Sequence, residues 1–199
     1  MTGGAPLGTV ASVARWAGDV RERLTSAAQQ LVAEHGFDAT TVGAIARRAG
    51  VAESSFYRHF PDKGAVLQPD AAATIERLSA AVRSAPAGAT AMHAAGAAVE
   101  DLCRGLEAEP DAAVALAAAI AASASLRERE LVRHAALADA VAAALQERGV
   151  APATAGLTAS TVMLVLRAAT ADWVAGDGSR RLPHLFLARL EDLGRAFAE

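Results

Sequence analysis

Side chains that could bind a nucleic acid are concentrated in one short stretch of the sequence, residues 51–60. The apolar residues Val51, Phe56 and Phe60 are spaced to pack inward from a helix. The other positions face elsewhere and carry acidic, hydroxyl, phenol, guanidinium and imidazole groups: Glu53, Ser54, Ser55, Tyr57, Arg58 and His59. A short helix of this kind can enter the major groove of DNA when a second helix supports it.

The residues before this stretch predict the supporting elements. The nine residues from Thr41 predict a short helix, which Thr41 itself can cap, and Gly50-Val51-Ala52 predicts a tight turn. Two short helices joined by a Gly-containing turn form a helix-turn-helix. A longer helix precedes them: Asp19 and Glu22 predict its start as a capping box, and His35-Gly36 predicts its end.

The rest of the chain predicts further helices and no strand. Hydrophobic residues make up 53% of the 199 residues and aromatic residues only 4%, and Ala, the strongest helix former, dominates. A fourth helix is predicted from Asp62, with a kink or break at Pro69. Five more are predicted at 91–106, 112–123, 125–148, 154–173 and 183–197, with Ser125 and Glu128 as a capping box. We therefore predict an all-α protein of about nine helices.

Charge and cysteine content narrow the class of protein. Residues 1–68 carry seven Lys or Arg against six Asp or Glu, whereas the remainder carries 12 against 16, so a weak basic bias lies at the N-terminal end. Cys103 is the only cysteine, which excludes an intrachain disulfide and a cysteine metal cage. The first 18 residues lack the basic start of a signal peptide, and no stretch is apolar enough for a good membrane span. We expect a soluble cytoplasmic protein without a membrane partner.

The sequence offers little support for an enzyme. His93 and Cys103 could be cast as base and nucleophile, but nothing in the sequence brings them together. There is no Gly-rich phosphate loop, no metal-ligand pair and no nucleophile elbow. We expect no catalytic residues, no metal and no cofactor.

The stretch from Val20 to Leu67 resembles the TetR family of bacterial transcriptional regulators. The resemblance lies in a specific combination of residues: Gly36-Phe37, Thr40-Thr41, Ile45-Ala46, Ala49-Gly50-Val51, Phe56-Tyr57, His59-Phe60 and Lys63. It implies a homodimeric repressor that binds a palindromic operator in double-stranded DNA and is released by a small-molecule effector. It also implies a DNA-binding domain at 19–66 and a helical effector-binding and dimerisation domain at 67–199. Residues 1–18 show no periodicity and are rich in small residues, so we expect them to form a flexible arm.

The resemblance also implies roles for single residues. Thr41, Tyr57, His59 and Lys63 match family positions that usually contact phosphates, and each can donate a hydrogen bond. The alternative for Tyr57 and His59 is packing in the core with one internal hydrogen bond. Three residues match positions that face base edges: Glu53, Ser54 and Ser55.

The chain departs from the family pattern at three positions. Ala52 stands where a polar capping residue is common, Gly43 has no side chain to contact a base, and Glu53 would repel phosphate although it can accept from cytosine. Arg48 is a further candidate for facing bases, with a solvated surface charge as the equal alternative. Base recognition would then depend on the two serines, on DNA shape and on Arg48.

The C-terminal part predicts an effector pocket and a dimer interface. An Ala-rich bundle leaves room between helices, and the unusual residues that could line such a space are Met92, His93, Cys103, His134, Met163 and Trp173, although ordinary core or surface positions are the alternative for each. The helix at 154–173 is apolar on nearly every face, and the last helix carries a regular apolar stripe. The resemblance implies that the last two helices form the dimer interface, which makes Leu164, Phe186, Leu190, Leu193 and Phe197 its predicted residues, with an intramolecular core as the alternative for the stripe. A helical interaction module without DNA binding remains the main alternative for the whole chain.

Overall fold

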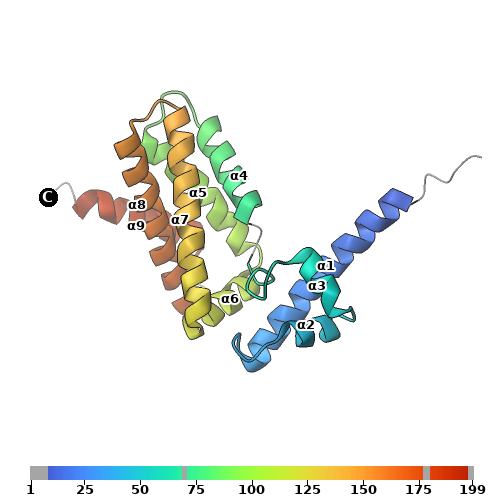
Figure 1. The fold of residues 1–199 in the computed structure, drawn as a ribbon. Coiled ribbons are helices and arrows are strands. Elements are labelled where there is room, and N and C mark those ends of the chain that lie inside the picture. Colours follow the sequence, from blue (N-terminus) through green and yellow to red (C-terminus); the bar gives the residue numbers. More distant parts are fainter. Residues whose placement is uncertain (1–8, 69–70, 177–179, 197–199) are drawn as a thin grey trace, which may run out of the picture. The chain divides into compact units, whose positions relative to one another are not determined.

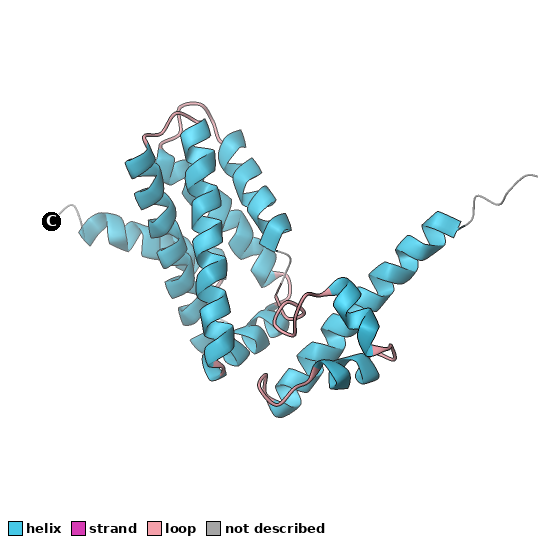
Figure 2. Cartoon of the chain, in the orientation of Figure 1, coloured by secondary structure: helices cyan, strands magenta, loops and turns pink. Residues whose placement is uncertain are grey.

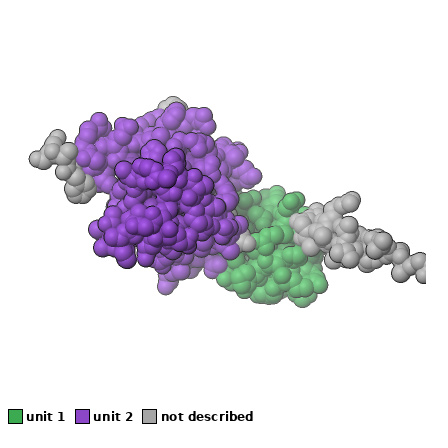
Figure 3. Space-filling view, turned by 90° about the horizontal axis from the view of Figure 1, so that it is seen from above, with its two compact units in different colours: residues 1–69 green, residues 70–199 purple. Residues whose placement is uncertain are grey.

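The computed structural model describes residues 9–68, 71–176 and 180–196, which form nine α-helices and no strand (Figures 1 and 2). The predicted all-α class is therefore confirmed. The chain divides into two compact units, residues 1–69 and 70–199, coloured green and purple in Figure 3.

Unit 1 contains α1 (Thr9–His35), α2 (Val42–Arg48) and α3 (Glu53–His59). The predicted start of the first helix at Asp19 was wrong, because α1 begins ten residues earlier. Residues 9–18 contain no proline and three alanines, which allows a helix there despite Gly18 and the β-branched residues. The first eight residues of the predicted arm lie outside the described residues. α1 ends as predicted, and Gly36 follows it with a φ of 80°, a backbone angle that residues with a side chain rarely adopt.

The predicted helix from Asp62 is absent: residues 63–67 form hydrogen-bonded turns, with bends at 61–62 and 68. Asp62 does act as a cap, because its Oδ1 accepts hydrogen bonds from the backbone N–H groups of Gly64 at 2.8 Å and Ala65 at 3.0 Å. Pro69 in the sequence disfavours helical backbone at the residue before it, so the turn cannot extend into a helix. Lys63 therefore lies in a turn, and the next helix begins only at Ala71.

Unit 2 contains the other six helices. These are α4 (Ala71–Ser84), α5 (Ala91–Glu107), α6 (Pro110–Ala122), α7 (Ala124–Glu147), α8 (Pro152–Ala175) and α9 (Leu182–Ala196). The bounds of α5 to α9 lie within three residues of those predicted. The capping residue of α7 was predicted wrongly: Ser123, rather than Ser125, accepts the hydrogen bond from the backbone N–H of Leu126.

The core of unit 2 is built around α8, which packs against α5, α7 and α9. Nine of its residues are buried, as its apolar sequence predicted. Among the described helices, only α8 is long and apolar enough to cross a membrane, and 44% of its apolar window is buried inside the protein. A core helix meets the same criterion, so this is weak evidence for a membrane span.

Two charged side chains stabilise the ends of helices in unit 2 through hydrogen bonds. Glu107, at the end of α5, accepts hydrogen bonds from Arg181 Nη2 at 2.7 Å and from the backbone N–H of Leu182 at 2.8 Å. The hydrogen bond from Arg181 holds the pKa of Glu107 below its ordinary value. After α7, Arg148 donates to the carbonyl oxygens of Ala85 and Pro86, both at 2.7 Å, and so fixes the turn between α4 and α5.

Candidate nucleic-acid interface

A helix-turn-helix forms where the sequence predicted it. Thr41 caps α2, with its Oγ1 accepting a hydrogen bond from the backbone N–H of Ala44 at 3.1 Å. Gly50 has a φ of 69°, which lets the chain turn sharply, and the N–H of Val51 donates back to the carbonyl of Ala46 at 3.0 Å. Ala52 precedes α3 and makes no side-chain capping bond, as expected from its methyl side chain.

The face of α3 that turns inward is aromatic. Phe56 and Phe60 are buried, with their ring centroids 5.5 Å apart. Arg21 of α1 lies over the Phe60 ring, 4.5 Å from its centroid, and donates from Nη1 to the carbonyl oxygen of His59 at 3.1 Å. This residue ties the C-terminal end of α3 to α1. No local sequence pattern indicates this contact, because Arg21 and His59 lie 38 positions apart.

The predicted phosphate-binding residues differ in how free their donors are. Tyr57 is 56% exposed and meets Phe56 edge-on, and its hydroxyl has no hydrogen-bond partner among the described residues. Thr41 is exposed; its oxygen accepts the capping bond, so its proton can still be donated. His59 is half-buried. Each of these three side chains can therefore donate a hydrogen bond to a phosphate oxygen.

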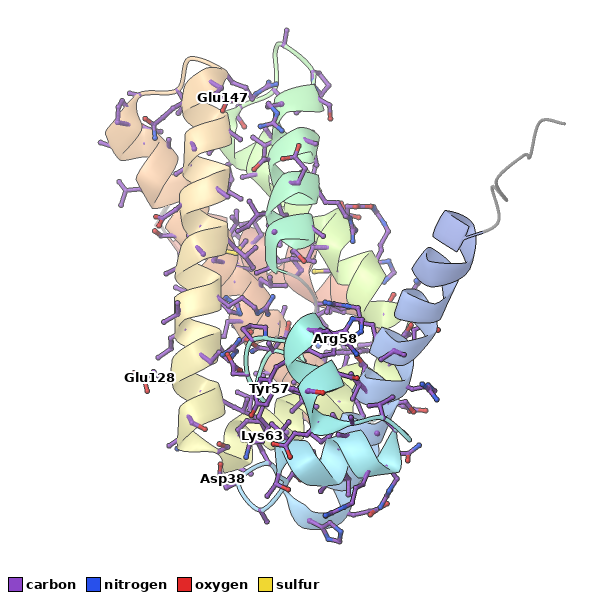
Figure 4. The ribbon with its side chains drawn as sticks, turned by 45° about the vertical axis from the view of Figure 1, so that its right-hand side comes forward. Asp38, Tyr57, Arg58, Lys63, Glu128 and Glu147 are labelled. Carbon is purple, nitrogen blue, oxygen red and sulfur yellow. The ribbon has the colours of Figure 1, made fainter. Side chains whose placement is uncertain are left out.

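Lys63 is engaged within unit 1. Its Nζ donates to the carbonyl oxygen of Phe37 at 2.7 Å and lies 4.1 Å from the centroid of the Phe37 ring, with Asp38 O at 3.5 Å (Figure 4). The ammonium group therefore fastens the turn that follows α1. Since an ammonium group has three N–H donors, one remains for a phosphate.

The predicted base-facing residues are not all alike in the structure. Ser54 and Glu53 are exposed and Ser55 is half-buried. The Glu53 carboxylate lies across α2, where a Cβ added at Gly43 would be 3.1 Å from Glu53 Oε2. Two of the three departures from the family pattern are therefore linked in space, because the missing side chain at Gly43 makes room for the carboxylate of Glu53.

Arg48 is paired with α1 instead of projecting freely. Its Nη1 and Nη2 donate to the two carboxylate oxygens of Glu34 at 2.9 and 2.8 Å, and Nη1 lies 3.4 Å from Gln30 Oε1. The hydrogen bond from Arg48 lowers the pKa of Glu34. A contact between Arg48 and a base, which stays a prediction, would require this ion pair to open.

Arg58 is a candidate that the sequence interpretation placed only on an unspecified outer face. It is exposed on α3, and its Nη2 donates to Ser55 Oγ at 2.7 Å (Figure 4). The signal was present in the sequence, since residues three apart are neighbours on a helix.

The predicted effector residues fall into two groups in unit 2. Cys103, Met163 and Trp173 are buried in one apolar cluster, against which Met92 packs. His93 is exposed and does not belong to this cluster. His134 lies on α7, where its Nε2 is 2.9 Å from Glu130 Oε1. The structure thus brings four of the six residues together.

Cys103 cannot act as a nucleophile in this fold. The side chain is fully buried, and burial raises the pKa of its thiol to about 12. Because the thiolate is the reactive form, a thiol with this pKa is inert near neutral pH.

The stripe predicted for the dimer interface faces mainly inward. Phe186 is fully buried in its own chain, so its assignment to the interface was wrong. Leu190 and Leu193 are partly buried against the same core, and Leu190 packs over Gly96 of α5. An amphipathic helix has one apolar face, and α9 uses it against α5 and α8. Leu164 is 54% exposed on α8, while Phe197 lies outside the described residues.

Comparisons with known proteins agree with this geometry. Residues 24–68 match the sequence profile of bacterial regulatory proteins of the tetR family. A search of curated proteins finds no significant match.

The fold matches solved structures of transcriptional regulators. Thermus thermophilus FadR, a TetR-family repressor in complex with lauroyl-CoA, is 24% identical over 86% of this chain and 91% of its own, with a TM-score of 0.57. Bacillus subtilis FadR in complex with stearoyl-CoA is 20% identical over 85% and 95%, with a TM-score of 0.58. A regulator from Aquifex aeolicus is 18% identical over 89% and 99%, with a TM-score of 0.55. The chain thus carries the N-terminal domain of the TetR family of bacterial regulatory proteins and has the fold of that family's transcriptional regulators.

Proposed function

We propose that the protein is a DNA-binding transcriptional repressor that binds a palindromic operator as a homodimer. The observation that carries this proposal is the outer side of α3, where Ser54, Tyr57 and Arg58 are exposed while Phe56 and Phe60 hold the helix to its unit. A supported helix with an exposed polar face is what entry into the major groove requires.

The free donors around α3 support phosphate contacts on both sides of the groove. The Tyr57 hydroxyl, the Thr41 hydroxyl proton and the remaining N–H of Lys63 are all available. The net charge of the whole chain is −3, so binding would depend on these local groups and not on a strongly basic surface.

Fluorescence anisotropy with the protein's own promoter region tests DNA binding. The wild-type protein should bind this DNA at low salt, and Tyr57→Phe, which removes only the hydroxyl, should weaken binding to all sequences. Val114→Ala is a matched surface control, because Val114 is exposed on α6 of unit 2. If the wild-type protein does not bind the promoter even at low salt, the repressor proposal is wrong.

The proposed dimer uses the outer face of α8. Leu157 is 72% exposed and Leu164 is 54% exposed, and their spacing of seven places them on the same side of the helix, together with Ser160 and Ala168. Most soluble oligomers are closed and symmetric, and a C2 dimer presents the same patch from both subunits. We therefore assign this face of α8 to the dimer in place of the inward stripe of α9.

Sedimentation velocity distinguishes this face from others. Leu164→Asp should produce monomers, because a carboxylate would be buried against the same residue of the partner. Leu131→Asp is the matched control, since Leu131 is 59% exposed on α7, and it should leave the dimer intact. A dimer that persists in Leu164→Asp, or that Leu131→Asp dissociates, contradicts the assignment.

We propose a small-molecule effector that binds within unit 2 and releases the protein from DNA. The cluster around Cys103, Met163 and Trp173 is apolar and rich in Ala, as an apolar ligand would need. Two proteins of similar fold are described with bound lauroyl-CoA and stearoyl-CoA, which makes long-chain acyl-CoA the first class to test.

Calorimetric titration with lauroyl-CoA and stearoyl-CoA, with coenzyme A alone as control, tests this class. Binding of the acylated forms but not of coenzyme A, with release of promoter DNA, is the expected result. Binding without release would make the compound a ligand but not an inducer. No binding by either acyl-CoA excludes this effector class.

A cytoplasmic location is part of the proposal, because the target is genomic DNA.

The alternative function is a helical interaction module that does not bind DNA. The observation that favours it is Glu53, an exposed acid in the first turn of α3. The promoter-binding experiment decides between the two functions.

A further inference from the structure

We propose that Arg58 contacts a guanine in each half of the DNA site and that Ser55 positions its guanidinium group. The inference rests on the proposed DNA-binding function and adds the residue that determines sequence preference. The structure juxtaposes the two side chains directly, with Arg58 Nη2 2.7 Å from Ser55 Oγ.

The geometry of α3 places Arg58 at the centre of its outer face. Successive residues of an α-helix are about 100° apart around its axis, so Ser54 and Arg58, each two positions from the buried Phe56, both lie roughly 160° from it. Ser54 and Arg58 are therefore the two residues that project most directly away from unit 1. Tyr57 lies about 100° from Phe56, on the flank of the helix, where a phosphate contact is the expected role.

The direction of the Arg58 side chain brings its charge toward the N-terminal end of α3. Side chains on a helix lean toward its N-terminus. The hydrogen bond to Ser55 continues this direction and carries the guanidinium from the last turn of α3 back to the first. The first turn of a recognition helix is the part that meets base edges.

The chemistry of the pair suits guanine. A guanidinium has five N–H donors in a fixed plane, and the bond to Ser55 uses one of them. The others include a pair that can donate to the N7 and O6 acceptors of guanine, which is the commonest specific contact in the major groove. Because Ser55 fixes one nitrogen, the guanidinium loses less freedom when it meets the base.

The charge of Arg58 is also available. In the part of the chain that the structure describes, Arg58 forms no ion pair, whereas both terminal nitrogens of Arg48 are bound to Glu34. Of these two arginines, only Arg58 can reach DNA without first breaking an ion pair.

Selection of bound sequences from a random DNA pool tests the inference. For the wild-type protein we expect a guanine at one position of each half-site. Arg58→Ala should accept any base there, keep its other preferences, and bind the selected site about tenfold to a hundredfold more weakly. Arg47→Ala is the matched control: it removes an exposed arginine of α2 and should leave the preference for guanine unchanged.

Binding of the selected site at several salt concentrations separates a base contact from a phosphate contact. If Arg58→Ala weakens binding to all sequences alike and lowers the salt slope by about one, Arg58 contacts a phosphate and the inference is wrong. If Arg58→Ala still selects the same guanine, the inference is also wrong, although DNA binding itself stands. If the wild-type protein selects no sequence, both the inference and the proposed function are wrong.

A double-mutant cycle tests the role of Ser55. Ser55→Ala should weaken the preference for guanine when Arg58 is present and should change nothing further when Arg58 is already Ala. Ser55→Thr, which keeps the hydroxyl, should restore the preference. An equal effect of Ser55→Ala in both backgrounds would show that Ser55 acts independently and would overturn its positioning role.

Discussion

The contacts of Arg21 with His59 and Phe60 should stabilise α3, the proposed recognition helix, against local unfolding. Arg21→Met keeps an unbranched side chain over the Phe60 ring but removes the charge and the hydrogen bond to His59 O. A hydrogen bond from a charged group contributes about 1.5–3 kcal/mol, and an exposed cation–π contact contributes about 0.5–1 kcal/mol. Because the bond is exposed, the lower ends apply, and the two together stabilise α3 by about 2 kcal/mol.

Hydrogen exchange measured by mass spectrometry reports this change locally. A loss of about 2 kcal/mol corresponds to exchange roughly 30 times faster for peptides that cover residues 53–60. Peptides from α7 and α8 should exchange at the wild-type rate, because they belong to unit 2. Affinity for DNA should fall as well, since α3 must be ordered before it can bind.

Arg47→Met is the matched control for this experiment. It also replaces an exposed arginine of unit 1, but Arg47 forms no ion pair or hydrogen bond through its side chain among the described residues, so exchange in α3 should not change. If Arg21→Met leaves exchange over residues 53–60 at the wild-type rate, the contacts of Arg21 do not stabilise α3 and the reasoning fails.

Three further changes test other contacts. Burial opposes ionisation of Glu130, but hydrogen bonds from His134 and Arg133 outweigh it and lower its pKa from 4.5 to about 2. Since the folded-state pKa is the lower one, this stabilisation is present above about pH 4.5 and lost as the pH falls toward 2. Glu130→Gln should therefore cost up to about 3 kcal/mol in urea unfolding at pH 7 and progressively less below pH 4.5; a cost independent of pH would contradict this. Lys63→Met should weaken binding to all DNA sequences and lower the salt slope, and an altered sequence preference would exclude a phosphate role. Cys103 should react with a thiol reagent only after unfolding, because its pKa is about 12 and it is buried; rapid labelling of the native protein at pH 7 would refute this.

Most of the candidate site was predictable because its determinants are local. Thr41, Gly50 and the spacing of Phe56 and Phe60 act within one or two helical turns, so the sequence alone placed α2, the turn and α3. One local prediction failed: the segment 61–68 was predicted to begin a helix, but Pro69 disfavours helical backbone at the residue before it. The contacts with DNA that the sequence predicted stay predictions.

The sequence alone therefore predicted the all-α class, most helix bounds and the family of the N-terminal domain. Which charged side chains are free depends instead on how the chain folds. Arg48 and Lys63 resemble available cations in the sequence, but Glu34 and the carbonyl of Phe37, 14 and 26 positions away, engage them. The tertiary structure also decided that Phe186 belongs to the core and that α8 presents the exposed leucines. The physical reason is common to these cases: a periodic pattern shows that a helix has an apolar face or a charged residue, whereas the partner of that face or charge depends on segments distant in the chain.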